Sequence, residues 1–300
     1  MGLFDWLKGS KEAPQTGAAP GMIVLLDGMP QFDAQAATKA LDAIEELRAP
    51  SKIEIENAPV GGKTAEGDEV EGALHGSAEF DSHSIGIVGF DAPAPGQVME
   101  KTVKVSNWTG EAREQLENHY AHLVLMHAGG GASTLEKYIA LYKLAAVLGG
   151  GHLRGVVIED AWTCAPADLV REFTNPDMLK AFRESIPPIL FSGFVRFTTD
   201  EGAWFVTKGH HLFNAPDLAM EGAEEKPSEV MDLFMNIFLY VAGQKAQIAP
   251  GHTLQIAEEA FLKFSEIAPD NPWKDWLLGA GQTLQLRRIS KDEINRKGGA

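Results

Sequence analysis

Four polar residues that could take part in chemistry lie close together in the C-terminal half of the chain. Lys208, His210 and His211 are near neighbours, and Asp217 follows six residues after His211. An amine, an imidazole and a carboxylate transfer protons in catalysis, and the same groups hold polar ligands by hydrogen bonds. We therefore predict a functional or ligand-binding site at these four residues.

Two further residues are candidates for the same site, because sites recruit side chains from separate segments. Glu159 follows a predicted buried strand, and carboxylates at strand ends often line functional crevices. His252 comes from a segment farther along the chain. Adjacent residues of an extended chain point to opposite sides, so only one of His210 and His211 naturally faces a given site. The spacings His-x-His and His-Glu-x-x-His are absent, and we predict no metal site and no cofactor.

Other motifs favour structural roles over catalysis. The glycine-rich stretch 127–134 precedes a helix but lacks the Lys-Ser/Thr ending of a phosphate-binding loop, and Ser133 with Glu136 fits a capping box. Cys164 has no base beside it in the sequence and is predicted to be a buried thiol. Gly-x-Ser-x-Gly does not occur. Because no complete catalytic signature is found, the sequence favours a protein that is not an enzyme.

A hairpin and an apolar helix must position the four polar residues. Residues 191–197 form a β-rich run, and residues 204–207 form its partner across the turn Asp200-Glu201-Gly202. A strongly apolar helix is predicted at 228–242. Lys208 therefore stands where the second strand of the hairpin ends.

Strand and helix signals alternate along the rest of the chain. Because a hairpin interrupts this alternation, we expect mixed sheets and an α+β (mixed α/β) fold, with two ferredoxin-like pseudo-repeats as one arrangement. The body, 22–290, forms one domain or two halves, 22–128 and 129–290. Strands are expected at 22–26, 52–56, 84–90, 120–127, 153–158, 252–256 and 283–289, helices at 33–47, 109–118, 133–148, 166–173, 177–184 and 258–267, and a surface loop at 61–76.

The two ends differ from this body. Residues 1–21 are predicted to form a short amphipathic N-terminus and a flexible linker, and residues 291–300 a frayed tail. The apolar side chains at the start either dock on the protein itself or make peripheral membrane contact. They are Leu3, Phe4, Trp6 and Leu7.

Composition excludes several classes of protein. The 300 residues include 42 acidic and 26 basic side chains, and the formal charge of -16 opposes binding to nucleic acid or anionic lipid. A single cysteine fits a reducing compartment, so we expect a cytoplasmic protein. No apolar run approaches the roughly 20 residues that span a bilayer, and we predict no transmembrane segment.

The C-terminal half resembles a known family. The run Gly202-Ala-Trp-Phe-Val-Thr-Lys-Gly-His-His-Leu-Phe-Asn-Ala-Pro-Asp-Leu218, then Tyr240-Val-Ala-Gly243 and Pro250-Gly-His-Thr253, is similar to the bacterial "domain of unknown function 4261" family. The resemblance covers mainly residues 187–289 and implies no activity or catalytic residues. Asn214 stands where this pattern leads us to expect glycine, and asparagine tolerates the left-handed backbone better than most residues.

Two hypotheses follow from these observations. The first is a cytoplasmic, non-enzymatic binding or adaptor protein of the immunity- or secretion-associated type, whose partner is another protein. The alternative is a small-ligand-binding protein or an enzyme with a pocket at the hairpin exit. That pocket would draw on Lys208, His210 or His211, Asp217, Glu159 and His252.

Overall fold

The computed structural model divides the chain into two units. Of the described residues, those within Met1–Glu159 and Cys164–Ile186 form unit 1, and those within Asp160–Thr163 and Pro187–Ala300 form unit 2. A boundary between residues 128 and 129 therefore falls inside unit 1. The predicted amphipathic N-terminus, with most of the linker after it, lies outside the described residues. The structure describes residues 19–63, 69–129, 132–200, 202–222, 225–244 and 246–295.

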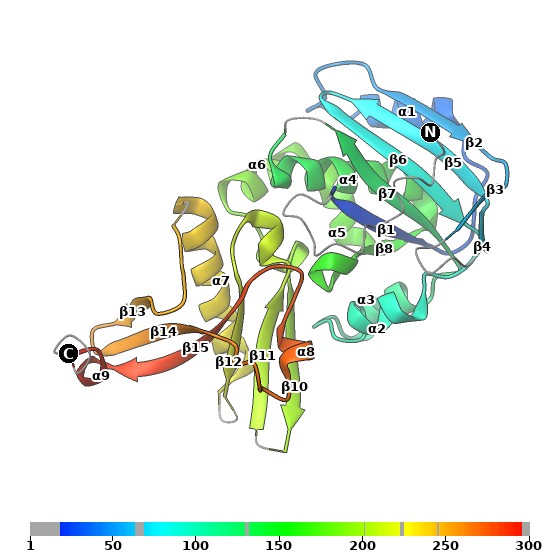
Figure 1. Cartoon of the computed structure of the whole chain (residues 1–300). Coiled ribbons are helices and arrows are strands. Elements are labelled where there is room, and N and C mark those ends of the chain that lie inside the picture. The colour runs from blue at the N-terminus through cyan, green and yellow to red at the C-terminus, as the bar shows by residue number, and fades with distance from the viewer. Residues whose placement is uncertain are drawn as a thin grey trace. The chain divides into compact units, whose positions relative to one another are not determined.

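Unit 1 is built on one large sheet in the described part of the chain (Figure 1). A separate hairpin joins β3 (Val60–Lys63) to β4 (Glu69–Gly72). The strand order of the large sheet is β2 (Lys52–Glu56), β5 (Leu74–Phe80), β6 (His83–Phe90), β7 (Ala121–Gly129), β1 (Gly21–Leu26), β8 (Leu153–Ile158) and β9 (Thr163–Pro166). In this sheet the strand pairs β2–β5, β5–β6, β6–β7, β7–β1 and β1–β8 are all antiparallel.

Helices cover the central strands of this sheet. Helix α4 (Thr134–Gly149) packs against β1, β7 and β8, and the Ser133 hydroxyl caps it by accepting a hydrogen bond from the Glu136 amide. Side chains of β1 and β8 pack with those of two short helices, α2 (Gly96–Lys101) and α3 (Gly110–Glu117), in a cluster that includes Leu25, Leu116 and Val157. The other helices of unit 1 in the described residues are α1 (Ala34–Asp42), α5 (Ala167–Arg171) and α6 (Pro176–Glu184).

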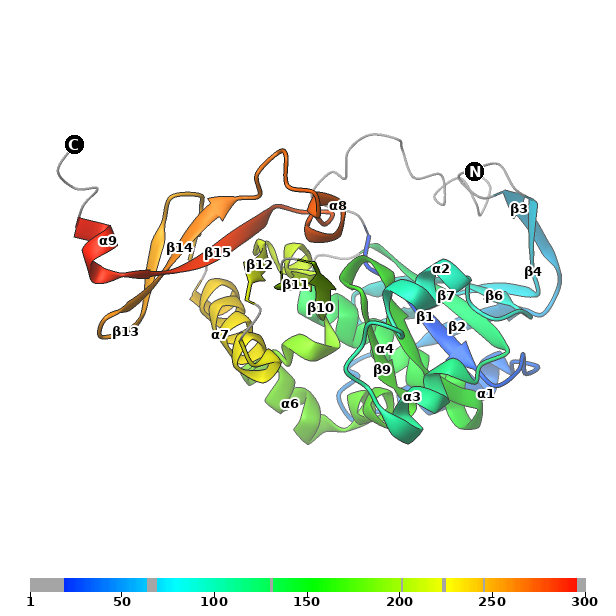
Figure 2. The ribbon, with the colours of Figure 1, turned by 90° about the horizontal axis from the view of Figure 1, so that it is seen from below.

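Unit 2 has a mixed sheet, as expected from the hairpin. Strands β12 and β15 pair parallel, and the other neighbours pair antiparallel. Figure 2 shows α7 (Pro227–Gln244) on one side of β10 to β12 and α8 (Lys274–Leu277) on the other. The strand order is β10 (Gly193–Thr199), β11 (Gly202–Lys208), β12 (Asp217–Glu221), β15 (Thr283–Ser290), β14 (Ala260–Glu266) and β13 (Thr253–Ala257).

The α+β class is confirmed by these helices and by sheets that are mixed or antiparallel. The predicted hairpin is confirmed as well, with Gly193 opposite Lys208 and Thr199 opposite Gly202. The two large sheets differ in strand number and order, so the units do not repeat one arrangement.

Two local predictions are wrong. The predicted helix 258–267 is the strand β14, because Leu262 and Phe264 are buried at the two-residue period of a strand. The predicted loop 61–76 contains β3, β4 and the start of β5. Of the predicted frayed tail 291–300, residues Lys291–Asn295 form helix α9, where Glu293 accepts hydrogen bonds from the Ser290 amide and the Arg287 guanidinium, and residues 296–300 lie outside the described residues.

Candidate functional site

The turn after the hairpin brings the four predicted polar residues together in unit 2. Gly209 has a φ of 108°, and an added Cβ there would lie 2.6 Å from the Ala161 Cβ and 2.8 Å from the Phe191 carbonyl oxygen. A 3-10 turn follows and ends at Asn214, whose φ of 58° is the left-handed conformation expected for it. The chain then enters β12 with Asp217 beside the end of β11.

Lys208 is held inside unit 2 by groups that leave it little access to solvent. Its Nζ donates hydrogen bonds to the carbonyl oxygens of Leu277, at 3.1 Å, and Leu278, at 2.6 Å. It also lies 5.0 Å from the ring centroid of Trp162, within range of a cation–π interaction. Burial lowers the pKa of Lys208 to about 8, and the nearby Asp217 carboxylate offsets part of that shift. The ammonium thus fastens the α8 segment to the sheet.

Asp217 and the two histidines complete this buried cluster. Asp217 is 0% exposed, and its Oδ1 accepts hydrogen bonds from the His210 amide at 3.0 Å and the Thr207 hydroxyl at 3.4 Å. The His210 ring packs on Phe238, and burial lowers the pKa of His210. His211 Nδ1 lies 3.5 Å from Asp217 Oδ2, which is ion-pair distance without the alignment of a hydrogen bond.

The other two predicted residues lie elsewhere. Glu159 belongs to unit 1. His252 is exposed and lies just before β13, the edge strand at the end of the sheet away from β11. Its Nδ1 accepts a hydrogen bond from the Ala249 amide. Lys208, His210 and Asp217 are each at most 2% exposed, so a ligand reaches them only if the covering segment moves. A functional role for these six residues stays a prediction, and the geometry of Lys208, His210 and Asp217 is that of a polar core.

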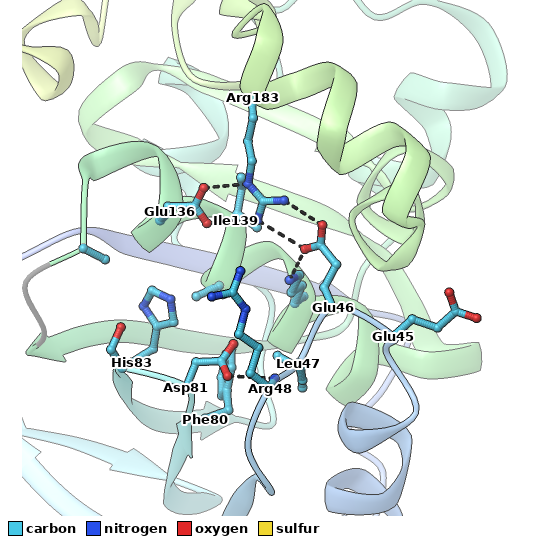
Figure 3. A pocket seen from close by; sticks show the side chains of 14 residues that line it. Glu45, Glu46, Leu47, Arg48, Phe80, Asp81, His83, Glu136, Ile139 and Arg183 are labelled. Atoms are coloured by element: carbon cyan, nitrogen blue, oxygen red, sulfur yellow. Dashed lines mark hydrogen bonds and ion pairs between the residues drawn. The ribbon is translucent and has the colours of Figure 1, made fainter.

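Unit 1 holds an open cleft of about 780 Å³ that the sequence did not indicate (Figure 3). Its lining comes from the segment after α1, from the turn between β5 and β6, from α4 and from α6. Ligand-binding pockets commonly have volumes of about 300–1,000 Å³. The size of this cleft is therefore that of a small-molecule site.

One wall of the cleft is a network of paired charges. Arg183 donates to Glu46, with Nη1 2.6 Å from Oε1 and Nη2 3.2 Å from Oε2. It also donates to Glu136, with Nε 2.6 Å from Oε1 and Nη2 3.0 Å from Oε2. The nearly buried Lys143 donates to Glu46 Oε2 at 2.9 Å. Burial alone would raise the pKa of Glu46, but its bonds from Arg183 and Lys143 outweigh burial and lower that pKa.

The opposite wall is the turn between β5 and β6. Asp81 has a φ of 50°, and its Oδ1 accepts a hydrogen bond of 3.1 Å from the Arg48 amide. His83 Nδ1 and His127 Nε2 are 2.9 Å apart across the β6–β7 pair. Burial, and then the neighbouring His83, lower the pKa of His127 to about 4, and burial also lowers the pKa of His83. Both imidazoles are thus uncharged near neutral pH.

The polar groups that line the cleft differ in whether they already have partners. The carboxylates Glu46 and Glu136 are already paired with cations, whereas Arg48 and His83 present polar atoms toward the cleft. Among the described residues, no group of three or more His, Cys, Asp or Glu side chains is placed to hold a metal ion. Cys164 is buried, and burial raises the pKa of its thiol to about 12, so it is not a ready nucleophile.

The comparison with known families concerns unit 2. Residues 206–272 match the model of a family described as "Domain of unknown function (DUF4261)", which confirms the resemblance over that segment. No curated protein and no solved structure matches the chain. The matched segment includes the buried cluster from Lys208 to Asp217, and the cleft of unit 1 lies outside it.

In the described part of the chain, no helix is both long enough and apolar enough to cross a bilayer.

Replacement of Lys208 tests whether the cluster is a coupled polar core. We expect Lys208→Met to lower the free energy of unfolding by about 3–5 kcal/mol, because the carbonyl groups of Leu277 and Leu278 lose their buried donor and Asp217 loses a nearby positive charge. The double variant Lys208→Met/Asp217→Asn should lose less than the sum of the single variants. Urea unfolding followed by tryptophan fluorescence measures each value. The exposed Lys274→Met is the matched control, with an expected change within about 0.5 kcal/mol, and strictly additive losses would show that the pair is not coupled.

The histidine pair makes stability depend on pH. The pKa of His127 is about 4 in the folded protein against 6.5 ordinarily, so the unfolded chain binds a proton that the folded chain lacks between these values. This contribution to stability is complete above pH 6.5 and is lost as the pH falls toward 4. In His127→Gln, the slope of unfolding free energy against pH should be smaller by up to about 1.4 kcal/mol per pH unit. Urea unfolding at several pH values measures this slope, and equal slopes for both proteins would contradict the assignment.

Proposed function

We propose that this protein binds a small molecule in the cleft of unit 1. The observation that carries the proposal is the combination of a volume of about 780 Å³ with walls built from interacting side chains. The Arg183 network holds one wall in place before any ligand arrives, and the Asp81 turn with the histidine pair holds the other. Such preorganisation favours binding, because the ligand does not have to order the side chains that it contacts.

The proposal favours a ligand-binding protein over an enzyme. A general base near neutral pH needs a free lone pair beside the reacting group. Two of the four acids that line the cleft, Glu46 and Glu136, are engaged by Arg183 and are not free for that task, which leaves only Glu45, Asp81 and the neutral His83. A cytoplasmic location remains part of the proposal, and the buried, uncrosslinked thiol of Cys164 supports it.

A cleft-filling substitution tests this function. Ser82 lies in the exposed turn that lines the cleft, and an indole at this position occupies the space that a ligand would use. Saturation-transfer NMR with a set of anionic, cationic and neutral fragments should detect binders to the unaltered protein. Ser82→Trp should weaken their binding by at least about tenfold, which corresponds to 1.4 kcal/mol.

The control is Ser185→Trp, at another exposed serine of unit 1 that lies outside the cleft lining. It should leave fragment binding unchanged. Absence of any binder, or equal binding to both tryptophan variants, would count against the cleft as the site.

A second function, recognition of another protein, is supported by a different observation in unit 2. Trp276 and Leu278 are each 48% exposed, and Trp276 stands over Phe197 and Trp162 at ring-centroid distances of 5.8 Å and 6.3 Å. Large exposed aromatic side chains on a packed base are typical of protein-binding surfaces. This is the binding or adaptor role expected from the sequence, and we retain it as the alternative.

Removal of this surface tests the alternative function. In Trp276→Ser/Leu278→Ser, any partner that the unaltered protein captures reproducibly from native lysate should be lost. The substitution Tyr120→Ser, at a residue of unit 1 that is 65% exposed, controls for a general loss of apolar surface. Retention of the same partner by the double variant would remove this surface from consideration.

A further inference from the structure

The charges of the cleft differ in whether they already have partners. Arg183 and Lys143 are paired with Glu46, and Arg183 is paired with Glu136 as well. These two cations and two carboxylates cancel in formal charge and supply a rigid wall. A ligand gains little from them, because it would have to break an existing ion pair to form a new one.

Arg48 is different, because its cationic group has no such partner. Its backbone amide is tied to Asp81, which fixes the base of the side chain. The side chain extends into the cleft (Figure 3). Within the described residues, no carboxylate lies at ion-pair distance from its guanidinium. Glu45, the remaining acid from the same segment, points away from the Arg183 network in Figure 3.

A guanidinium has a defined chemical preference. Its five N–H donors lie in one plane and match two oxygens of a carboxylate or a phosphate group. It accepts no hydrogen bonds, so neutral donors and cations gain nothing from it. A free guanidinium in a preformed cleft therefore selects oxyanions.

His83 supplies a second polar contact beside it. One ring nitrogen is engaged with His127, and Phe80 lies against the ring at a centroid distance of 5.7 Å, so the orientation of the imidazole is fixed. The other nitrogen, Nε2, has no hydrogen-bond partner within the described residues. His83 lines the same cleft as Arg48.

We propose that Arg48 binds the oxyanion group, a carboxylate or a phosphate, of the small molecule that occupies the cleft, with His83 as a second polar contact. This inference rests on the proposed function and adds the chemical class of the ligand. Glu45, Asp81 and Glu136 limit the affinity for anions through their charge, although Glu136 is paired with Arg183 and Asp81 Oδ1 is turned to the Arg48 amide.

An NMR titration of the arginine side chains tests the inference. The Nε–Hε signal of Arg48 is assigned by its loss in Arg48→Gln, and sodium acetate and sodium phosphate are added at constant ionic strength. We expect a saturable shift of this signal with at least one of the two anions, and the anion that saturates at lower concentration identifies the group. Trimethylammonium chloride, the cationic probe, should produce no saturable shift.

Variants separate recognition by Arg48 from general charge effects. Arg48→Gln should abolish the saturable response of the neighbouring His83 ring signals, and Arg48→Lys should weaken it by about tenfold, because lysine keeps the charge and loses the planar fork. Arg171→Gln, at an exposed arginine of unit 1 outside the cleft lining, should leave it unchanged. Since Arg48 is exposed, these variants should fold normally, and the dispersion of their amide spectra checks this.

Failure of this inference can be distinguished from failure of the proposed function. If neutral or cationic fragments bind the cleft while neither anion gives a saturable shift, the oxyanion assignment is wrong and the cleft remains a ligand site. An equal anion response in Arg48→Gln would likewise overturn the assignment. If no class of probe binds the cleft, both the site and its ligand class are refuted.

Discussion

Unit 1 depends on one guanidinium that is clamped between two carboxylates. Arg183 comes from α6, Glu136 from α4 and Glu46 from the segment after α1, so a single side chain links three parts of the chain that lie far apart in sequence. Arginine suits this position because its planar fork can pair with a carboxylate on each of two edges. With Lys143 also bound to Glu46, the wall is formally neutral, and the unpaired Arg48 across the cleft becomes the group that selects a ligand.

Unit 2 shows that residues of catalytic type can serve the fold. Lys208 and Asp217 are residue types found in active sites. The Lys208 ammonium, however, donates hydrogen bonds to two carbonyl groups of the α8 segment, and the Asp217 carboxylate accepts one from the His210 amide. Buried charges contribute little net stability, but removing one partner is costly. Their arrangement therefore fixes how the α8 segment joins the sheet. The cluster is closed to solvent, whereas the cleft of unit 1 is open to it.

Regular elements were predictable where one periodicity dominated. Strand β8 and helices α4 and α7 follow clear apolar patterns, and the β10–β11 hairpin has a recognisable turn between two β-rich runs. The segment of strand β14 fits both periods, because acidic residues flank a mixed interior, and pairing with β15 makes it a strand. The cluster at the hairpin exit is local in sequence, so its convergence could be foreseen. The cleft could not, because Arg48, His83, Glu136 and Arg183 come from separate segments and no spacing connects them. The missed strand β5 also hid the Asp81 turn that places Arg48.

The central claim is that ligands bind at the cleft of unit 1 and that the cluster at the hairpin exit is a closed polar core. Backbone-amide NMR of the full chain, recorded with and without the fragments that bind, tests both parts at once. We expect the largest chemical-shift changes on residues lining the cleft, such as Ser82 and His83. Residues 207–217 should change little. Shifts concentrated at Lys208, His211 and Asp217, with the cleft unaffected, would contradict the claim.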